Sequence, residues 1–278
     1  MKKLLSILMA VAMIAASLAL VSCGGEEILV DTNAFFAPFE YYEGTKIVGV
    51  DVDIMNKVGE KLGKKVKFFN TDFGPIIDNV SEGKICDCGA AGLTITEARS
   101  ALVDFSIPYY TSVQYVIYSK TSPLAAKDAN IVWEDLTGMT IGVQADTTGW
   151  IYTDGEINAQ ESDPDYGYDG VLYGTGTALK AFDSAQLAAD AIGSMVDVVI
   201  VDELPALYIC EKSSGKLVCE PLYYSGETTP VEEQYAICVT KGNDTLLKAI
   251  NEVLTELLVE DEKGESQIEK MVMAHMGF

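Results

Sequence analysis

The chain has 278 residues, of which 49% are hydrophobic and 22% are charged. That length suits one large domain or two ordinary ones, and the composition can bury substantial cores. There are 19 basic and 42 acidic residues, so the formal net charge is −23. This excess of negative charge argues against nucleic acid or an anionic membrane surface as a direct partner, and it predicts a well-solvated surface.

The first 23 residues differ from the rest of the chain. Lys2 and Lys3 give a basic start, residues 4–22 carry no charge, and the segment closes with Leu-Val-Ser-Cys23. A basic start, an apolar core and small residues at the end are typical of a secretory signal. We therefore expect a signal peptide over residues 1–22 and an extracytoplasmic protein. An uncleaved membrane anchor of about 20 residues is the alternative.

Strand-like and helix-like patterns alternate in the first half of the chain. The expected strands are the apolar runs Ile28–Val30, Val66–Phe69 and Ile85–Ala91. One expected helix ends at Gly63 and carries apolar residues at helical spacing, namely Ile54, Met55, Val58 and Leu62. A shorter expected helix ends at Gly83 and carries Ile76, Ile77 and Val80.

A third helix start is expected at Thr96, where a threonine N-cap precedes helix-forming residues. The third helical position prefers Glu or Gln, which would complete a capping box, but here it is Arg99. A cation in the first turn opposes the helix dipole at a cost of about 0.3–1 kcal/mol. The partner of Arg99 is therefore a central question, and Glu97 and Asp104 are two nearby candidates.

The second half repeats the alternation. Strands are expected at Gln114–Ser119, Thr140–Gln144 and Val196–Val201, and a helix at residues 184–192. A long amphipathic helix near the end carries Leu246, Leu247, Ile250, Val253, Leu254, Leu257 and Leu258. The alternation predicts an α/β fold with largely parallel sheets.

An acidic stretch, Asp154–Gly170, lies within the second half and is expected to be a solvated surface loop. The spacing of Asp163, Asp165 and Asp169 has a faint likeness to a calcium loop. It lacks the third ligand position and the closing Glu of that motif.

Five cysteines follow Cys23, at positions 86, 88, 210, 219 and 238. An odd number leaves at least one thiol free unless chains pair with each other. Cys86 and Cys88 lie two apart in an expected strand, which does not easily meet disulfide geometry, so we expect buried small hydrophobes. Cys210 with Cys219 stays a candidate disulfide. With one histidine, His275, we expect no metal site and no cofactor.

Polar and aromatic residues follow the ends of the expected strands, where ligands bind in open α/β sheets. They are Asn33, Phe36, Phe73, Gly92, Thr94, Arg99, Thr147, Thr148 and Asp202. A guanidinium and helix N–H groups suit a carboxylate, and a carboxylate with oxygen acceptors suits an ammonium. Aromatic walls suit a side chain. The set therefore predicts a site for a free α-amino acid, although each residue alone also has a structural interpretation, such as Asp202 capping a helix that starts at Glu203.

Several segments now identify a family by resemblance. They are "FFAPFEYYEGTKIVGVDVDIMNKVGEKLGKKV", "SEGKICDCGAAGLTITEARSALVDFSIPYY", "IGVQADTTG", "VDVVIVDE" and "EQYAICVTKGN". In this order they resemble the family 3 solute-binding proteins of ABC importers for polar amino acids, such as the histidine- and glutamine-binding proteins. The ending Leu-Val-Ser-Cys23 likewise resembles a lipobox, which implies lipidation at Cys23 and anchoring at the membrane.

The resemblance implies a two-lobed, type II periplasmic-binding-protein-like fold with a ligand cleft between the lobes. Two crossover strands would fall near Tyr109–Val113 and Val231–Tyr235. One lobe would comprise residues 24–108 and 236–278, and the other residues 114–230. The protein would act as a monomer and deliver its ligand to a membrane permease.

The resemblance also implies residue roles. Arg99 would clamp the ligand α-carboxylate, assisted by Thr147 and Thr148. Asp202, Gly92 and Thr94 would bind the α-ammonium. Phe36 and Phe73 would form aromatic walls, and Asn33 would line the side-chain end. Because the relatives that take cationic amino acids commonly carry an acidic residue at the position of Asn33, we expect a ligand with an uncharged side chain.

One departure concerns Asp146, which stands where the family usually has Gly. An αL conformation there would cost Asp less than most residues, but its charge is unexpected beside a carboxylate site. Two other hypotheses use the same fold. One is a cyclohexadienyl dehydratase-like enzyme, which would need a general acid or base beyond Asp202. The other is a sensor that signals through a separate membrane protein.

Overall fold

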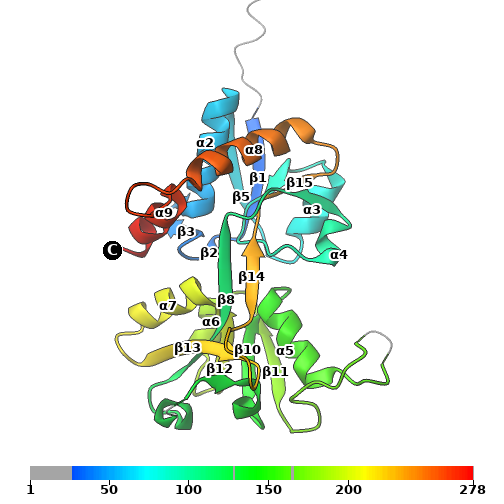
Figure 1. Ribbon diagram of the computed structural model, residues 1–278, viewed down its shortest axis with the longest axis vertical. Coiled ribbons are helices and arrows are strands. Elements are labelled where there is room, and N and C mark those ends of the chain that lie inside the picture. The colour runs from blue at the N-terminus through cyan, green and yellow to red at the C-terminus, as the bar shows by residue number, and fades with distance from the viewer. Residues whose placement is uncertain (1–26, 128, 164–165, 278) are drawn as a thin grey trace, which may run out of the picture.

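The computed structural model describes residues 27–127, 129–163 and 166–277. They form two α/β lobes stacked along the long axis of the molecule, with β8 and β14 passing between them (Figure 1). This confirms the two-lobed fold with two crossover strands.

The upper lobe in Figure 1 is built on a five-stranded sheet in the order β5-β1-β6-β15-β7. Its strands are β1 (Glu27–Thr32), β5 (Lys65–Asn70), β6 (Cys88–Gly89), β7 (Val103–Phe105) and β15 (Cys238–Thr240). Its helices are α2 (Val50–Leu62), α3 (Ile76–Glu82), α4 (Glu97–Ser100), α8 (Asp244–Leu257) and α9 (Gln267–Met276). A small separate sheet contains β2 (Phe35–Phe36), β3 (Glu40–Glu43) and β4 (Lys46–Val48).

The lower lobe is built on a seven-stranded sheet in which β11-β10-β12-β8-β13-β9 are neighbours and β14 also pairs with β8. Its strands are β8 (Tyr110–Ser119), β9 (Ile131–Val132), β10 (Thr140–Gln144), β11 (Ala178–Phe182), β12 (Val198–Asp202), β13 (Leu217–Tyr223) and β14 (Glu232–Tyr235). Its α-helices are α5 (Thr148–Asn158), α6 (Ala185–Asp190) and α7 (Glu203–Lys212), and two short 3₁₀ helices cover Pro123–Ala126 and Trp133–Leu136.

Local chemistry explains the helix ends that the sequence predicts. Gly63 ends α2 with φ 65°, and Gly83 ends α3 with φ 60°, so both take the left-handed conformation that glycine adopts most readily. On α2 the predicted apolar face is buried, with Ile54, Met55 and Val58 fully covered. Packing of this face against the sheet holds the first lobe together.

The expectation of largely parallel sheets is wrong, because both sheets are mixed. In the first sheet β1 runs parallel to β5 and β6, but β15 is antiparallel to β6 and β7. In the second sheet β10 runs parallel to β11 and β12, but β8 is antiparallel to β12 and β13. The antiparallel members adjoin the passages between the lobes, because β8 is itself a crossover strand and β15 directly follows β14. The right-handed crossover rule concerns connections between parallel strands of one sheet, so it does not fix their direction.

Two other local expectations need correction. Of the strand expected over Ile85–Ala91, only β6 (Cys88–Gly89) forms. The Leu29 N–H of the neighbouring strand donates to the Asp87 carboxylate at 2.8 Å, in place of a regular backbone bond between the two strands. The loop expected over Asp154–Gly170 begins in helix α5, and its Glu156 is buried. Glu156 accepts hydrogen bonds from the Val171 N–H and the Tyr224 hydroxyl, each at 2.8 Å, and so ties the segment to the lobe.

The N-terminal segment, including Cys23 and the expected signal peptide, lies outside the described residues. None of the helices in the described ranges has the length and apolar character needed to cross a bilayer. Cys86, Cys88, Cys210, Cys219 and Cys238 are all present as free thiols. Within the same ranges no group of three or more His, Cys, Asp or Glu side chains could hold a metal ion.

Candidate ligand-binding site

Arg99 lies at the junction of the two lobes and contacts both. Thr96 caps α4 as expected, with its hydroxyl accepting the Arg99 N–H at 3.1 Å. The guanidinium donates to the Thr94 carbonyl of the upper lobe at 3.0 Å and to the Asp146 carbonyl of the lower lobe at 3.1 Å. Its centre also lies 5.3 Å from the centroid of the Phe73 ring, within the range of a cation–π contact.

No described carboxylate lies within ion-pair distance of Arg99, which is the one arginine in the chain. Of the two nearby candidates, Asp104 accepts the Gly242 N–H instead. Burial lowers the pKa of Arg99, and the negative charges of Glu233 and Asp202 offset part of that effect. The guanidinium is therefore a half-buried cation that still lacks a directly bonded anion.

The N-terminus of α5 faces the same junction from the lower lobe. Thr147 is its N-cap, and its hydroxyl accepts the Trp150 N–H at 3.3 Å and donates to the Gln144 carbonyl at 2.8 Å. Thr148 is buried, and its hydroxyl lies 3.4 Å from that of Thr94 in the other lobe. The Thr147 hydroxyl is thus engaged within its own lobe, whereas the Thr148 hydroxyl points toward the junction.

Asp202 ends β12 and stands at the N-cap of α7, but its side chain makes no capping bond. Its carboxylate accepts the Tyr235 hydroxyl at 2.6 Å and the Gln114 amide of the crossover strand β8. Burial, followed by the charge of Glu233, raises the pKa of Asp202 well above its usual range. Asp202 is therefore turned toward the crossover strands and the junction.

The side-chain end of the expected site is closed by two amides. The Gln144 amide of the lower lobe donates to the Asn33 side-chain oxygen of the upper lobe at 3.0 Å, and both residues are buried. Phe36 is buried against Gly92, which has φ 53° and where an added Cβ would lie 2.9 Å from the Phe36 ring. Glycine is therefore required at this position by both its conformation and the space available.

Gly92 is further positioned by a buried carboxyl cluster behind it. The Asp51 carboxylate accepts the Gly92 N–H at 3.0 Å and the Tyr109 hydroxyl at 2.5 Å. Burial raises the pKa of Asp51 to about 6. Burial, and then the charge of Asp51, also raises the pKa of the neighbouring Glu40 well above its usual range.

Asp146 adopts the left-handed conformation, with φ 62°, in agreement with the sequence argument. Its side chain is exposed and lies against Gly74 of the other lobe, where an added Cβ would be 2.3 Å from the Asp146 carboxylate. A depression of about 220 Å³ opens there and is lined by Phe73, Gly74, Ile77, Asp78, Ala98, Arg99, Leu102 and Asp146. The unexpected charge of Asp146 thus lies at the rim of the junction.

Sequence reasoning missed three buried residues on the crossover strands, namely Gln114, Glu233 and Tyr235. The Glu233 carboxylate accepts hydrogen bonds from the Gln114 amide, from Thr94 of the upper lobe and from Thr148 of the lower lobe, the last at 2.5 Å. The signal was present: β14 alternates exposed and buried residues, so one of its two neighbouring glutamates must face inward.

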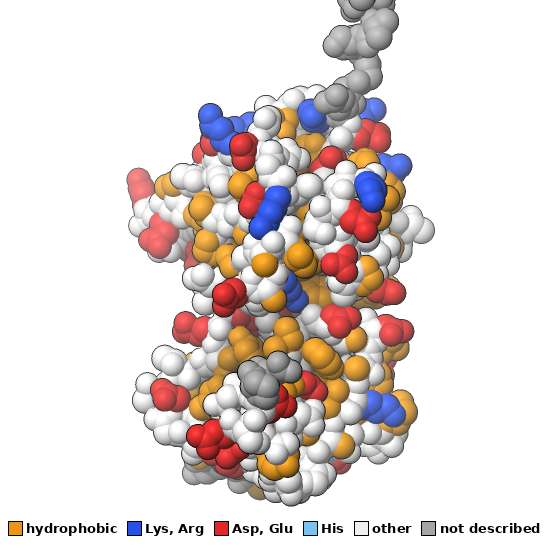
Figure 2. Space-filling view, turned by 90° about the vertical axis from the view of Figure 1, so that its right-hand side faces the viewer, with side chains coloured by type: hydrophobic (Ala, Val, Ile, Leu, Met, Phe, Trp, Pro, Cys, Tyr) orange, Lys and Arg blue, Asp and Glu red, His pale blue; other side chains and the backbone are white. Residues whose placement is uncertain are grey.

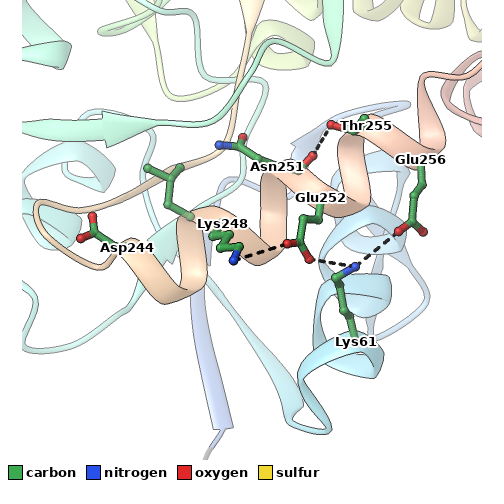
Figure 3. A pocket seen from close by; sticks show the side chains of 8 residues that line it. Lys61, Asp244, Lys248, Asn251, Glu252, Thr255 and Glu256 are labelled. Carbon is green, nitrogen blue, oxygen red and sulfur yellow. Dashed lines mark hydrogen bonds and ion pairs between the residues drawn. The ribbon is translucent and has the colours of Figure 1, made fainter.

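The expected site residues thus gather between the lobes. Figure 2 shows a narrowing of the molecule at this level, with hydrophobic side chains gathered along and below it. A depression elsewhere, of about 590 Å³ between α2 and α8, has a different character (Figure 3). There Lys61 pairs with Glu252 at 3.0 Å and Glu256 at 3.3 Å, so its cation is already matched by anions.

The molecule thus has two lobes joined by crossover strands, with an arginine and a buried carboxylate at the junction between them. This is the arrangement of the two-lobed solute-binding proteins. The family model of the bacterial extracellular solute-binding proteins, family 3, matches residues 28–267, and the chain belongs to that family.

Individual relatives agree with this assignment. The chain is 30% identical over 177 residues to the arginine-binding extracellular protein ArtP of Bacillus subtilis, covering 60% of this chain and 63% of that protein, which is less than two thirds of its length. It is 26% identical to a probable histidine-binding protein of Neisseria gonorrhoeae, covering 89% of each chain.

Solved structures show the same fold. A substrate-binding protein of an amino acid ABC transporter has a TM-score of 0.71 at 29% identity, covering 90% of this chain and 98% of that chain. An ancestral arginine-binding protein bound to glutamine has a TM-score of 0.70 at 32% identity, covering 91% and 98%.

Proposed function

We propose that this protein is the extracytoplasmic amino-acid-binding component of an ABC importer. It captures a free amino acid by closure of the two lobes and delivers it to a membrane permease. Closure is driven by the difference in ligand affinity between the open and closed states. The observation that carries the proposal is the half-buried Arg99, which contacts both lobes and has no carboxylate of the described residues within ion-pair distance. The buried acid Asp202 is near enough for its charge to act on the pKa of Arg99.

Each expected residue has a role in this proposal. Arg99 pairs with the ligand α-carboxylate, and the N-terminus of α5 at Thr147 and Thr148 donates to the same group. Asp202, Thr94 and the Gly92 backbone bind the α-ammonium. Phe36 and Phe73 line the side-chain channel, and Asn33 forms its end.

The lobe bounds and the anchor belong to the same proposal. One lobe comprises residues 24–108 and 236–278, and the other residues 114–230. After cleavage of a signal peptide over residues 1–22, lipidated Cys23 holds a monomer at the outer face of the membrane.

We infer that the ligand has an uncharged side chain. The end of the channel is the Asn33–Gln144 amide pair, which offers hydrogen bonds but no counter-charge. Burying an unpaired cation or anion there is costly, so charged side chains should be rejected. An acidic side chain would also need a second basic group, and Arg99 is already assigned to the α-carboxylate.

A thermal-shift screen of the standard amino acids tests both the function and the ligand class, because a bound ligand raises the melting temperature. We expect the largest shift from an amino acid with a neutral side chain. The relatives named for arginine and histidine make those two the informative competitors. A larger shift with arginine, lysine or histidine would contradict the neutral-ligand inference, and no shift with any amino acid would contradict the function.

The fate of the ligand distinguishes a binding protein from an enzyme. The chain's one histidine, His275, contacts Asp53 at 3.0 Å and Tyr41 at 3.1 Å and takes no part in the junction. Mass spectrometry of the ligand recovered after incubation should return it unchanged. A dehydrated or decarboxylated product would favour the enzyme, and transport lost on deletion of the protein would favour the importer over a sensor.

A further inference from the structure

Two buried carboxylates meet at the floor of the junction, and only one of them was expected there. Asp202 comes from β12 of the lower lobe, and Glu233 comes from the crossover strand β14. They are 6% and 4% exposed, and the Gln114 amide donates to both. One amide nitrogen thus lies within hydrogen-bond distance of both carboxylates, which makes the two acids close neighbours.

The partners of Glu233 place it at the ammonium end of the proposed site. One of them, Thr94, is itself proposed to bind the α-ammonium, and Asp202 is the other proposed ammonium partner. The Thr148 hydroxyl completes the contact from the lower lobe. Glu233 therefore connects groups from both lobes at the point where a positive charge is expected.

Two neighbouring buried carboxylates disfavour a second negative charge, because their repulsion and their loss of solvent both oppose it. Arg99 is a nearby cation, but its donors are directed to the carbonyls of Thr94 and Asp146. Burial, and then the charge of Glu233, raises the pKa of Asp202 well above its usual range, so Asp202 holds a proton in the ligand-free protein. A cation that binds between the two carboxylates takes the place of that proton.

We propose that Glu233 is a second carboxylate partner of the ligand α-ammonium, and that the ammonium takes the place of a proton that the Asp202 carboxyl holds in the ligand-free protein. The proton leaves to the solvent buffer as the ammonium enters. This inference rests on the proposed amino-acid-binding function and adds a specificity-determining residue to it. A primary ammonium has three N–H donors for the oxygen acceptors of Asp202, Glu233, Thr94 and the Gly92 backbone, so N-methylated amino acids, which lose a donor, should bind at least about tenfold more weakly.

Several other titratable groups act on one or both acids and must be separated from them, namely Arg99 on α4, Tyr152 on α5, Tyr235 on β14 and Glu40 on β3. Behind these, Asp51 on α2 acts on Glu40, and Asp146 at the rim acts on Arg99. Asp51 titrates near the working range, since its pKa is raised to about 6. A variant that changes only Glu233 leaves all of these groups in place.

The test is isothermal titration calorimetry of the mature protein between pH 6 and pH 8, in two buffers of different ionisation enthalpy. The probes are L-glutamine, L-arginine and L-histidine, followed by the standard amino acid with the largest thermal shift if none of these binds. Glu233→Gln is compared with Glu232→Gln, its exposed neighbour on the same strand. Glu232→Gln removes one negative charge, as Glu233→Gln does, but at an exposed position outside the proposed site.

For the wild-type protein and Glu232→Gln we expect release of up to one proton per ligand, and an affinity that rises by up to about tenfold per pH unit. For Glu233→Gln, Asp202 loses the opposing charge of Glu233 but stays buried, so proton release and pH dependence should decrease. Affinity should also fall by about thirtyfold or more.

Binding by Glu233→Gln with unchanged affinity and proton release would overturn the inference while leaving the amino-acid-binding function intact. If Glu233→Gln does not fold, the wild-type protein decides alone, since binding with no proton released would overturn the inference. Failure of every standard amino acid to bind the wild-type protein would instead overturn the function itself.

Discussion

Arg99 occupies a position that the local chemistry of its helix explains only in part. Its backbone N–H is capped by Thr96, which favours the helix start by about 0.5–2 kcal/mol. Helix α4 has only four residues, so the Arg99 charge lies in both its first and its last turn, and a dipole effect of about 0.3–1 kcal/mol has no single sign there. A pairing with a buried ligand carboxylate is worth more than either, so the residue's position is better explained by binding than by the stability of α4.

Replacing Arg99 tests this explanation. We expect Arg99→Ala to weaken amino-acid binding by about 2–5 kcal/mol, the usual cost of removing one partner of a buried charge pair. Arg99→Lys should recover little, because an ammonium cannot bind a carboxylate in the two-pronged geometry of a guanidinium. Calorimetry measures the affinity, and circular dichroism checks that the fold is kept. Lys84→Ala, an exposed lysine paired with Glu82, is the control and should bind normally.

At the scale of elements, helix α5 brings backbone N–H groups to the junction, and its start is fixed by one hydroxyl. Thr147 accepts the Trp150 N–H, and Ser266 does the same for Glu269 at the start of α9. Loss of such a cap usually costs about 0.5–2 kcal/mol. The two helices differ in place, because α9 lies at the outer edge of the upper lobe (Figure 1), whereas α5 begins beside Arg99 and Thr94.

This difference gives a paired prediction. Thr147→Ala and Ser266→Ala should each lower the free energy of unfolding by about 1 kcal/mol, measured by denaturant titration. Only Thr147→Ala should also weaken ligand binding, because it loosens the N–H groups that face the ligand carboxylate. Equal affinities for the two variants would show that the N-terminus of α5 does not contact the ligand.

The elements that the sequence predicts are those with a repeating pattern and a clear end. Helices α2 and α3 combine an apolar face with a terminal glycine, and β10 has the predicted bounds. The small sheet β2–β4 has strands of two to four residues, too short for a period to show. Helix α9 was missed although it carries a capping box, and the extent of α5 was missed because its apolar face is weakly marked.

The same limit applies to the candidate site. Residues that follow strand ends, such as Arg99 and Asp202, can be identified from the sequence because sheet topology places strand ends together. Glu233 lies within a crossover strand, and its position depends on how the two lobes close on each other. Alternation predicts that one of Glu232 and Glu233 is buried, but only the fold shows that the buried one shares the Gln114 amide with Asp202.

For the whole molecule, the proposed anchor determines where the binding site works. We expect Cys23→Ala to abolish lipidation, so that the protein is either released or held by an uncleaved signal. Metabolic labelling with a fatty acid, followed by fractionation of membrane and medium, measures both outcomes. Cys86→Ala, which changes a buried cysteine of the mature protein, should leave labelling unchanged. Continued labelling of Cys23→Ala would rule out that residue as the attachment site.

Buried acids also determine how the stability of the whole molecule depends on pH. Burial raises the pKa of Asp51 from 3.8 to about 6, and it raises those of Glu40 and Asp202 in the same direction. A folded state that holds protons more tightly than the unfolded state loses stability as pH rises between the two pKa values. Several other acids have a lowered pKa, namely Glu252, Asp261 and Glu269, but they are exposed, so solvent screening weakens their opposite effect.

We therefore expect the ligand-free protein to become less stable as pH rises from about 4 to about 6, with Asp51 contributing about 3 kcal/mol to the decrease. Asp51→Asn keeps an oxygen for the Gly92 N–H, and its amide N–H can donate to the Tyr109 hydroxyl oxygen. Because it cannot ionise, its stability should fall less over this range. Asp183→Asn, an exposed control, should follow the wild-type curve. Thermal unfolding at half-unit steps of pH measures all three proteins. Because Asp51 holds Gly92 in place, parallel curves for Asp51→Asn and the wild type would mean that this carboxyl is already ionised at pH 4, and that a fixed charge supports the ammonium end of the site from behind.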